Sequence, residues 1–226
     1  MKRPAVDYRT FRLSQLHEPQ FSHLKWLLGW VFYCVAYLLT EALIPAERCR
    51  VVHCFLDDLI PFCEYFVIPY VLWYFLIAGS LLYFLFYDTQ AFTNLQKYFI
   101  ITQIVAVAAY IICPSRQELR PAFFIRDNLL TQTVGLLYRI DTNTGVCPSL
   151  HCAFSIAIAS VWHKQRDIPP QFKTFMIFLA ILICMSTVRI KQHSVLDFFA
   201  ALPVCLLAEF LIFGKRRPVR LRRMPQ

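Results

Sequence analysis

Positions 65–87 read YFVIPYVLWYFLIAGSLLYFLFY and contain no charged side chain. Roughly 20 apolar residues in a helix suffice to cross about 30 Å of hydrocarbon. With five further apolar stretches the set of six is about Leu24–Ile44, Tyr65–Tyr87, Leu95–Cys113, Ser149–Trp162, Phe172–Val188 and Ser194–Phe213. The fourth of these stretches is short. The sequence therefore predicts an all-α polytopic membrane protein built as a bundle of six transmembrane helices.

The composition agrees with a membrane protein, because 58% of the residues are apolar and only 16% are charged, against about 25% charged in soluble domains. Internal repeats are absent, so residues 1–226 are expected to form a single domain: a segment 1–23, a bundle 24–213 and a basic tail 214–226. The net charge of +9 sits largely beside apolar stretches, which favours anionic lipids over nucleic acid as partners, above all at the tail. The oligomeric state stays open.

The distribution of Lys and Arg predicts the orientation of the six spans. One side of the arrangement would hold 15 basic residues, the two terminal segments included, and the other side 8. Both termini are therefore expected in the cytoplasm, with the plasma membrane as the expected location. Of the outer connections, Pro45–Glu64 is expected to include an interfacial segment, and Pro114–Val146 a short amphipathic helix that Asp127 caps.

Two polar clusters fall on the outer side, each where a connection enters an apolar stretch: Cys147-Pro148-Ser149-Leu150-His151 and His193-Ser194-Val195-Leu196-Asp197. His193 and Asp197 are four residues apart, so they share one face of a helix. A carboxylate on one ring nitrogen fixes the proton there and leaves the other nitrogen free as a nucleophile. By itself the spacing fits a packing contact at a helix start even better.

Ser149 and His151 begin the fourth stretch, where free N–H groups favour an anion, and His151 can act as a general acid. An ordinary helix cap explains the pair equally well. The outer side also carries four basic residues close to these clusters, and the Arg side chains among them can fork two phosphate oxygens. Those nearest His193 also fit the simpler interpretation of side chains that reach the headgroup layer. Candidate phosphate-binding residues are thus Arg120, Ser149, Arg116, Arg189 and Lys191.

Two histidines, a Ser hydroxyl and several cations on one patch suit a phosphoryl group. Cations neutralise its equatorial oxygens while one His attacks and the other protonates the leaving group. The outer side has no H-E-x-x-H motif, and Asp57-Asp58 is the only adjacent pair of acids. The sequence therefore predicts neither a metal ion nor another cofactor.

Taken together, these residues resemble the type 2 phosphatidic acid phosphatase superfamily, whose motifs read K-x6-R-P, P-S-x-H and S-R-x5-H-x3-D. The matching positions are Arg120-Pro121, then Pro148-Ser149-Leu150-His151, then Ser186 with His193 and Asp197. Cys113 stands in the Lys place of the first motif and Thr187 in the Arg place of the third. Both changes remove a cation, which leaves Arg116, Arg189 or Lys191 as replacements.

The resemblance covers roughly the region from Asp57 to Pro203. The stretches from Ser186 to His193 and from Asp57 to Phe62 look similar to the branch that includes inositol phosphorylceramide synthases. The resemblance implies a metal-independent enzyme with a phosphohistidine at His193, Asp197 orienting that ring and His151 protonating the leaving alcohol. Its substrate would be a phosphomonoester or diphosphate lipid in the extracytoplasmic leaflet, with chain length and headgroup open.

Two alternatives remain beside a lipid phosphatase. The third motif is also compatible with a phosphotransferase that moves a phospho-headgroup between lipids, as inositol phosphorylceramide or sphingomyelin synthases do. Cys113 and Thr187 motivate the other alternative, a non-catalytic membrane protein of the same fold that binds lipids.

Overall fold

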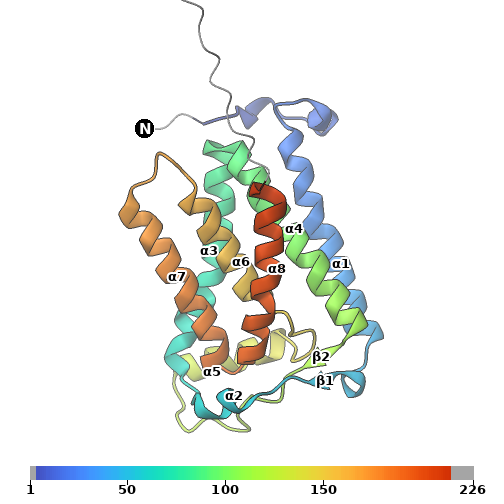
Figure 1. Ribbon diagram of the computed structural model, residues 1–226, viewed down its shortest axis with the longest axis vertical. Helices are drawn as coiled ribbons and strands as arrows, with labels where there is room; N and C mark the ends of the chain where they lie inside the picture. Colours follow the sequence, from blue (N-terminus) through green and yellow to red (C-terminus); the bar gives the residue numbers. More distant parts are fainter. Residues whose placement is uncertain (1–3, 215–226) are drawn as a thin grey trace, which may run out of the picture.

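The structure is a computed structural model that describes residues 4–214 of the chain, and it is an all-α bundle (Figure 1). Six helices form the bundle: α1 (Leu28–Leu43), α3 (Val67–Tyr87), α4 (Thr89–Ile112), α6 (Leu150–His163), α7 (Pro170–Arg189) and α8 (Val195–Phe213). Two shorter helices, α2 (Phe55–Leu59) and α5 (Leu129–Ile140), lie in the connections. Short 3-10 helices cover Tyr8–Thr10, Leu13–His17, Ser22–Leu27, Ala46–Arg48 and Glu64–Phe66. The basic tail beyond Gly214 lies outside the described residues.

Five helical segments in residues 4–214 are long and apolar enough to cross a membrane: Ser22–Leu43, Glu64–Tyr87, Thr89–Ile112, Pro170–Arg189 and Val195–Phe213. The expectation of an all-α membrane protein is confirmed at this level. The sixth helix, α6, has 14 residues, or about 21 Å at 1.5 Å per residue. It packs against α3, α4, α7 and α8 and lies among them in Figure 1. That α6 also counts as a span stays a prediction.

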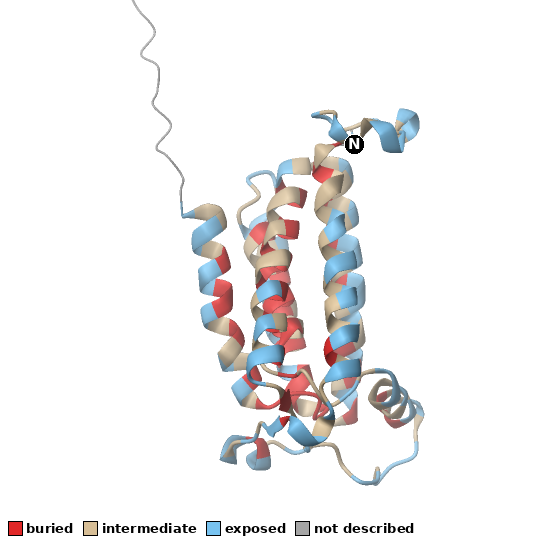
Figure 2. Cartoon of the chain, turned by 90° about the vertical axis from the view of Figure 1, so that its right-hand side faces the viewer, coloured by how far each residue is buried: buried red, intermediate tan, exposed pale blue. Residues whose placement is uncertain are grey.

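The core is aromatic, and several of its polar side chains form hydrogen bonds inside the bundle. Phe99 of α4 is fully buried between Phe154 of α6 and Trp30 of α1, at ring-centroid distances of 4.3 and 5.6 Å. The Trp30 indole donates to Gln96, and the Tyr98 hydroxyl donates to the carbonyl of Cys205. Exposed residues follow the outer faces of the helices (Figure 2), and many of them carry large apolar side chains. Such faces are what a helix bundle presents to lipid, where unpaired polar groups are costly.

All three connections expected outside lie at one end of the bundle, away from the described ends of the chain (Figure 1). Two of them pair through strands β1 (Arg50–Val51) and β2 (Ser115–Arg116), which run parallel. Helix α5 lies in the second of these connections, and its N-cap is Asn128 instead of the predicted Asp127. Asn128 accepts hydrogen bonds from the amides of Leu130 and Thr131, whereas Asp127 accepts from the side chain of Gln132. A short amide side chain satisfies free helix-start amides as well as a carboxylate does.

Replacing Phe99 with Ala should lower the thermal unfolding midpoint of the purified protein in detergent, because it removes a ring that joins α1, α4 and α6. Truncation of a buried Phe costs about 3 kcal/mol or more. Phe210 of α8 is 66% exposed and supplies the matched control. Equal shifts for Phe99→Ala and Phe210→Ala would contradict this packing.

Candidate functional site

The two sequence clusters meet at the outer-connection end of the bundle. The Nδ1 atom of His193 lies 3.0 Å from Oδ2 of Asp197, which confirms the predicted contact. On the other side of the same ring, Nε2 of His193 lies 3.4 Å from Nδ1 of His151. His193 thus sits between a carboxylate and a second imidazole. With its proton on Nδ1 towards Asp197, its Nε2 lone pair faces His151.

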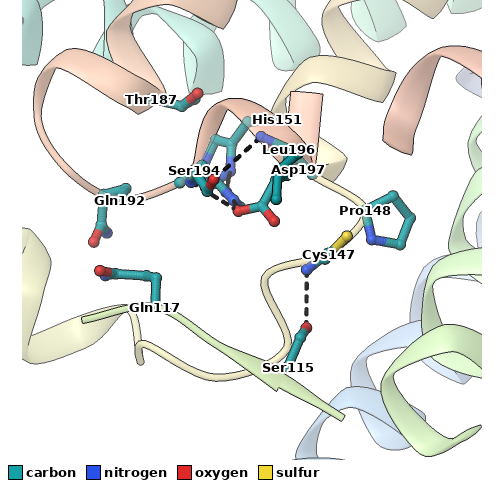
Figure 3. A network of polar contacts seen from close by, with 12 residues as sticks. Ser115, Gln117, Cys147, Pro148, His151, Thr187, Gln192, Ser194, Leu196 and Asp197 are labelled. Carbon is teal, nitrogen blue, oxygen red and sulfur yellow. Dashed lines mark hydrogen bonds and ion pairs between the residues drawn. The ribbon is translucent and has the colours of Figure 1, made fainter. Parts of the chain in front are cut away.

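The starts of α6 and α8 hold these side chains in place. Ser149 and Ser194 are the N-caps of the two helices, and Ser194 and Asp197 form a reciprocal capping box. The Ser149 amide donates to the backbone carbonyl of Asp197 at 3.1 Å, which joins the two helix starts directly. Figure 3 shows Ser194, Asp197 and His151 close together, with Cys147 and Pro148 beside them. The hydroxyl of Ser149 is fully buried and accepts from the amide of Cys152.

Burial and charge tune the groups at this joint. Burial works against a charged His193, but the hydrogen bond and the negative charge of Asp197 outweigh it, so the pKa of His193 is raised. Burial, followed by the charge of Asp197, raises the pKa of the Cys147 thiol to about 12. Cys147 is therefore protonated at neutral pH, and the imidazole is the better nucleophile of the two.

His151 and His193 open onto a cavity of about 290 Å³ between α1, α3, α4 and α6. The His151 ring lies against Trp73 and Tyr70 of α3, at centroid distances of 4.1 and 4.7 Å. Its Nε2 atom is buried without a hydrogen-bond partner. The Nδ1 atom of His151 faces His193. Nδ1, and not Nε2, is therefore the atom of His151 that can exchange a proton with a group bound between the two histidines.

The structure does not bring the four basic candidates to the cavity wall. Arg120 donates to the carbonyls of Tyr138, Asp141 and Thr142, and thereby holds the connection after α5. Arg116 pairs with Glu118 at 2.8 Å. Arg120 therefore supports the loop that closes the cavity, and neither side chain lines the cavity.

Lys191 and Arg189 lie towards α2 and the Glu64–Phe66 turn. The Lys191 ammonium donates to the carbonyls of Asp57 and Ile60, both at 2.6 Å, and its backbone is left-handed with φ of 58°. Such a φ is uncommon for a residue with a side chain and needs support from its surroundings. The Arg189 guanidinium lies over the ring of Phe66. Their phosphate-binding role stays a prediction.

Sequence reasoning gave no role to Asp57, which is 1% exposed. Its carboxylate accepts from the hydroxyl of Ser194 at 2.6 Å and from the amides of Val195 and Cys54, both at 2.8 Å. Burial alone would raise the pKa of Asp57, but these three donors outweigh it and the pKa is lowered. Asp57 therefore fixes the start of α8 from the first connection, 137 positions away in sequence.

Asp141 and Gln192 are two further residues that the sequence patterns did not single out. Oδ2 of Asp141 accepts from the Tyr70 hydroxyl at 2.9 Å and from the Gln192 amide at 3.0 Å. Both residues line the cavity. An acid in a loop and a Gln beside a His carry no spacing signal, so only the fold could find them.

Among residues 4–214, no group of three or more His, Cys, Asp or Glu side chains is arranged to hold a metal ion. All nine cysteines are free. Comparison of the chain with family models, curated proteins and solved structures gave no match.

Replacing Asp57 with Asn should destabilise the protein by about 1–3 kcal/mol, because bonds to a buried carboxylate are weakened or lost. The folded-state pKa of Asp57 is below its ordinary 3.8. Its stabilisation is therefore complete above about pH 4 and is lost as the pH falls through the lowered pKa. The measurement is the unfolding midpoint of wild type and Asp57→Asn across pH.

The difference in unfolding midpoint between wild type and Asp57→Asn should be constant near neutral pH and should become smaller in acid. Asp58→Asn is the matched control, since the Asp58 side chain is 67% exposed and bonds only to His53. A gap that widens as the pH falls, or an equal effect of Asp58→Asn, would contradict the role given to Asp57.

Proposed function

We propose that this protein is a metal-independent lipid phosphatase of the membrane, related to the type 2 phosphatidic acid phosphatases, with His193 as nucleophile. One observation carries the proposal: the ring of His193 bonds to Asp197 on one side and faces His151 on the other, at a cavity. Six spans, with α6 as the short central one, and α2 and α5 at the interface complete the proposed topology. The site would face the extracytoplasmic leaflet of the plasma membrane, with both termini cytoplasmic.

The proposed first step is attack of His193 Nε2 on the phosphorus of a phosphomonoester or diphosphate lipid. The new P–N bond forms as the P–O bond to the leaving oxygen breaks, and His151, in its imidazolium form, gives its Nδ1 proton to that oxygen and becomes a neutral imidazole. Asp197 stabilises the imidazolium character that develops on His193. Water then attacks the phosphohistidine, the P–N bond breaks, and His151 takes back a proton from the water.

The Nε2 atom of His193 and the Nδ1 atom of His151 are 3.4 Å apart, which leaves no room for a phosphoryl group between them. The two rings would therefore move apart when substrate binds. His151 packs against the tilted rings of Tyr70 and Trp73, whereas His193 is tied through Asp197 to the start of α8. The first amides of α6 lack helical partners and supply positive potential for the phosphate oxygens. Arg120 would act from behind the loop, by fixing Asp141 and Thr142.

A phosphotransferase is the second candidate, and the composition of the cavity favours it. No Lys or Arg of the described chain lines this cavity. A phosphodiester carries one negative charge and a phosphomonoester up to two, so the diester needs less compensation. The first covalent step is the same for both candidates; in the transferase a lipid alcohol replaces water in the second step. A non-catalytic lipid-binding protein would share the cavity but not the chemistry.

Replacing His193 with Ala should abolish phosphate release, or headgroup transfer when a lipid alcohol is supplied, and EDTA should leave the wild-type rate unchanged. The measurement is product formation from a panel of lipid phosphates, diphosphates and phosphodiesters. His53→Ala removes an exposed imidazole paired with Asp58 and controls for the loss of a His. Full turnover by folded His193→Ala would remove His193 from the nucleophile role; no turnover by wild type on any substrate would favour the non-catalytic alternative.

Replacing Asp197 with Asn should change the pH dependence of kcat/KM as well as its size. His193 attacks only when Nε2 is unprotonated, so activity falls as the pH drops through its raised pKa. Loss of the Asp197 charge lowers that pKa and moves the acidic limb to lower pH. The plateau should fall about a hundredfold or more. An acidic limb that stays in place or moves to higher pH would contradict this pairing.

A further inference from the structure

The cavity beside the two histidines has an aromatic wall. Its lining includes Trp30, Tyr33 and Tyr37 from α1, Trp73 and Tyr74 from α3, and Tyr110 from α4. Asp141 is the only Asp or Glu among the lining residues, and the lining includes no Lys or Arg. Ring faces carry negative potential, so apart from its histidines this wall is suited to a cation rather than to a second anion.

Oxygen atoms that can accept hydrogen bonds also make this wall suited to a cation. Asp141 already receives hydrogen bonds from Tyr70 and Gln192, and it lies within electrostatic reach of Tyr33, Tyr37, Tyr74 and His193. Gln192 is 3% exposed, and its Oε1 atom is buried without a partner. Arg120 lies behind the loop, where its guanidinium donates hydrogen bonds to the carbonyls of Tyr138, Asp141 and Thr142. It offsets part of the Asp141 charge without contacting the cavity.

We propose that this cavity binds the ammonium group of a phospholipid headgroup, as in phosphoethanolamine or phosphocholine lipids, with Asp141 and the tyrosines of α1 and α3 as its contacts. The inference rests on the proposed chemistry at His193 and favours its phosphotransferase form, since it places the phosphate of a phosphodiester lipid at His193. A phosphate there lies near Asp141, and a headgroup ammonium between the two would compensate both charges. Aromatic rings add cation–π attraction, which is strongest in a site shielded from water.

The substrate class that follows is a zwitterionic phosphodiester lipid. Attack by His193 Nε2 would form the P–N bond and break the P–O bond to the lipid glycerol, whose oxygen takes the His151 proton. The phospho-headgroup would then stay on His193 until water or a lipid alcohol removes it. Its ammonium would remain beside Asp141 in both steps.

The test measures lipid binding to a variant that lacks the proposed nucleophile. The full-length chain carrying His193→Ala is titrated in detergent with short-chain phosphatidylethanolamine, phosphatidylcholine, phosphatidylglycerol and phosphatidic acid, and Kd is measured by calorimetry. The two ammonium lipids should bind at least about tenfold more tightly than phosphatidylglycerol. Adding Asp141→Asn should remove that preference and leave phosphatidylglycerol unchanged or tighter. The ethanolamine and choline arms show whether the site prefers a primary or a quaternary ammonium.

Tyr37 gives an independent readout should Asp141→Asn disturb the loop. Tyr37→Phe keeps the ring and loses only the contact with Thr142, so it should retain the preference, whereas Tyr37→Leu should reduce it. Headgroup-selective binding to a wild-type protein that turns over none of these lipids would support this site and defeat the proposed chemistry. Equal affinity for all four lipids, or turnover by wild type without headgroup preference, would overturn the ammonium site and leave the chemistry standing.

Discussion

The joint between the starts of α6 and α8 is the contact on which the rest of the site depends. Neither helix start could place its histidine alone, because His151 and His193 approach each other from separate helices. The Ser149 amide bonds to the Asp197 carbonyl, and the Asp57 carboxylate caps Ser194 and Val195 from a third segment. The ring of His193 is thereby held between two partners instead of turning freely at a helix end. In proximity catalysis, misplacement by about 1 Å can cost a hundredfold in rate.

The bilayer explains why the polar groups gather where they do. The helices present apolar side chains on their outer faces, and the half-buried Trp30 and the buried Gln96 and Tyr98 form hydrogen bonds within the bundle. Most of the buried side-chain atoms that lack a partner in residues 4–214 lie at the end with the longer connections. The shortness of α6 lets its polar first turn start within the bundle's end, next to α8. A cavity at this end of the bundle follows from a short central helix packed among longer ones.

Much of this arrangement could be predicted from local patterns. Apolar runs of membrane length indicated the helices, and the four-residue spacing indicated the bond between His193 and Asp197. Counting the spans placed His151 and His193 at one end, and the structure has them in contact. Residues whose role depends on distant partners escaped prediction: Asp57 acts on Ser194, and Asp141 meets Tyr70 only in the fold. The contacts of the basic side chains could not be predicted from the sequence either. A Lys or Arg near a site in sequence can turn to carbonyl oxygens instead, as Lys191 and Arg120 do, and spacing does not set that direction.

The chemistry proposed for His193, between Asp197 and His151, requires a covalent phosphohistidine. Wild-type protein would be mixed briefly with a phosphorus-labelled substrate lipid, quenched in alkali, digested and mapped by mass spectrometry, since phosphohistidine survives base and is lost in acid. The account predicts label on the peptide that carries His193, stable in base and released by acid. Label on any other residue, or turnover with no labelled peptide at any quench time, would contradict it.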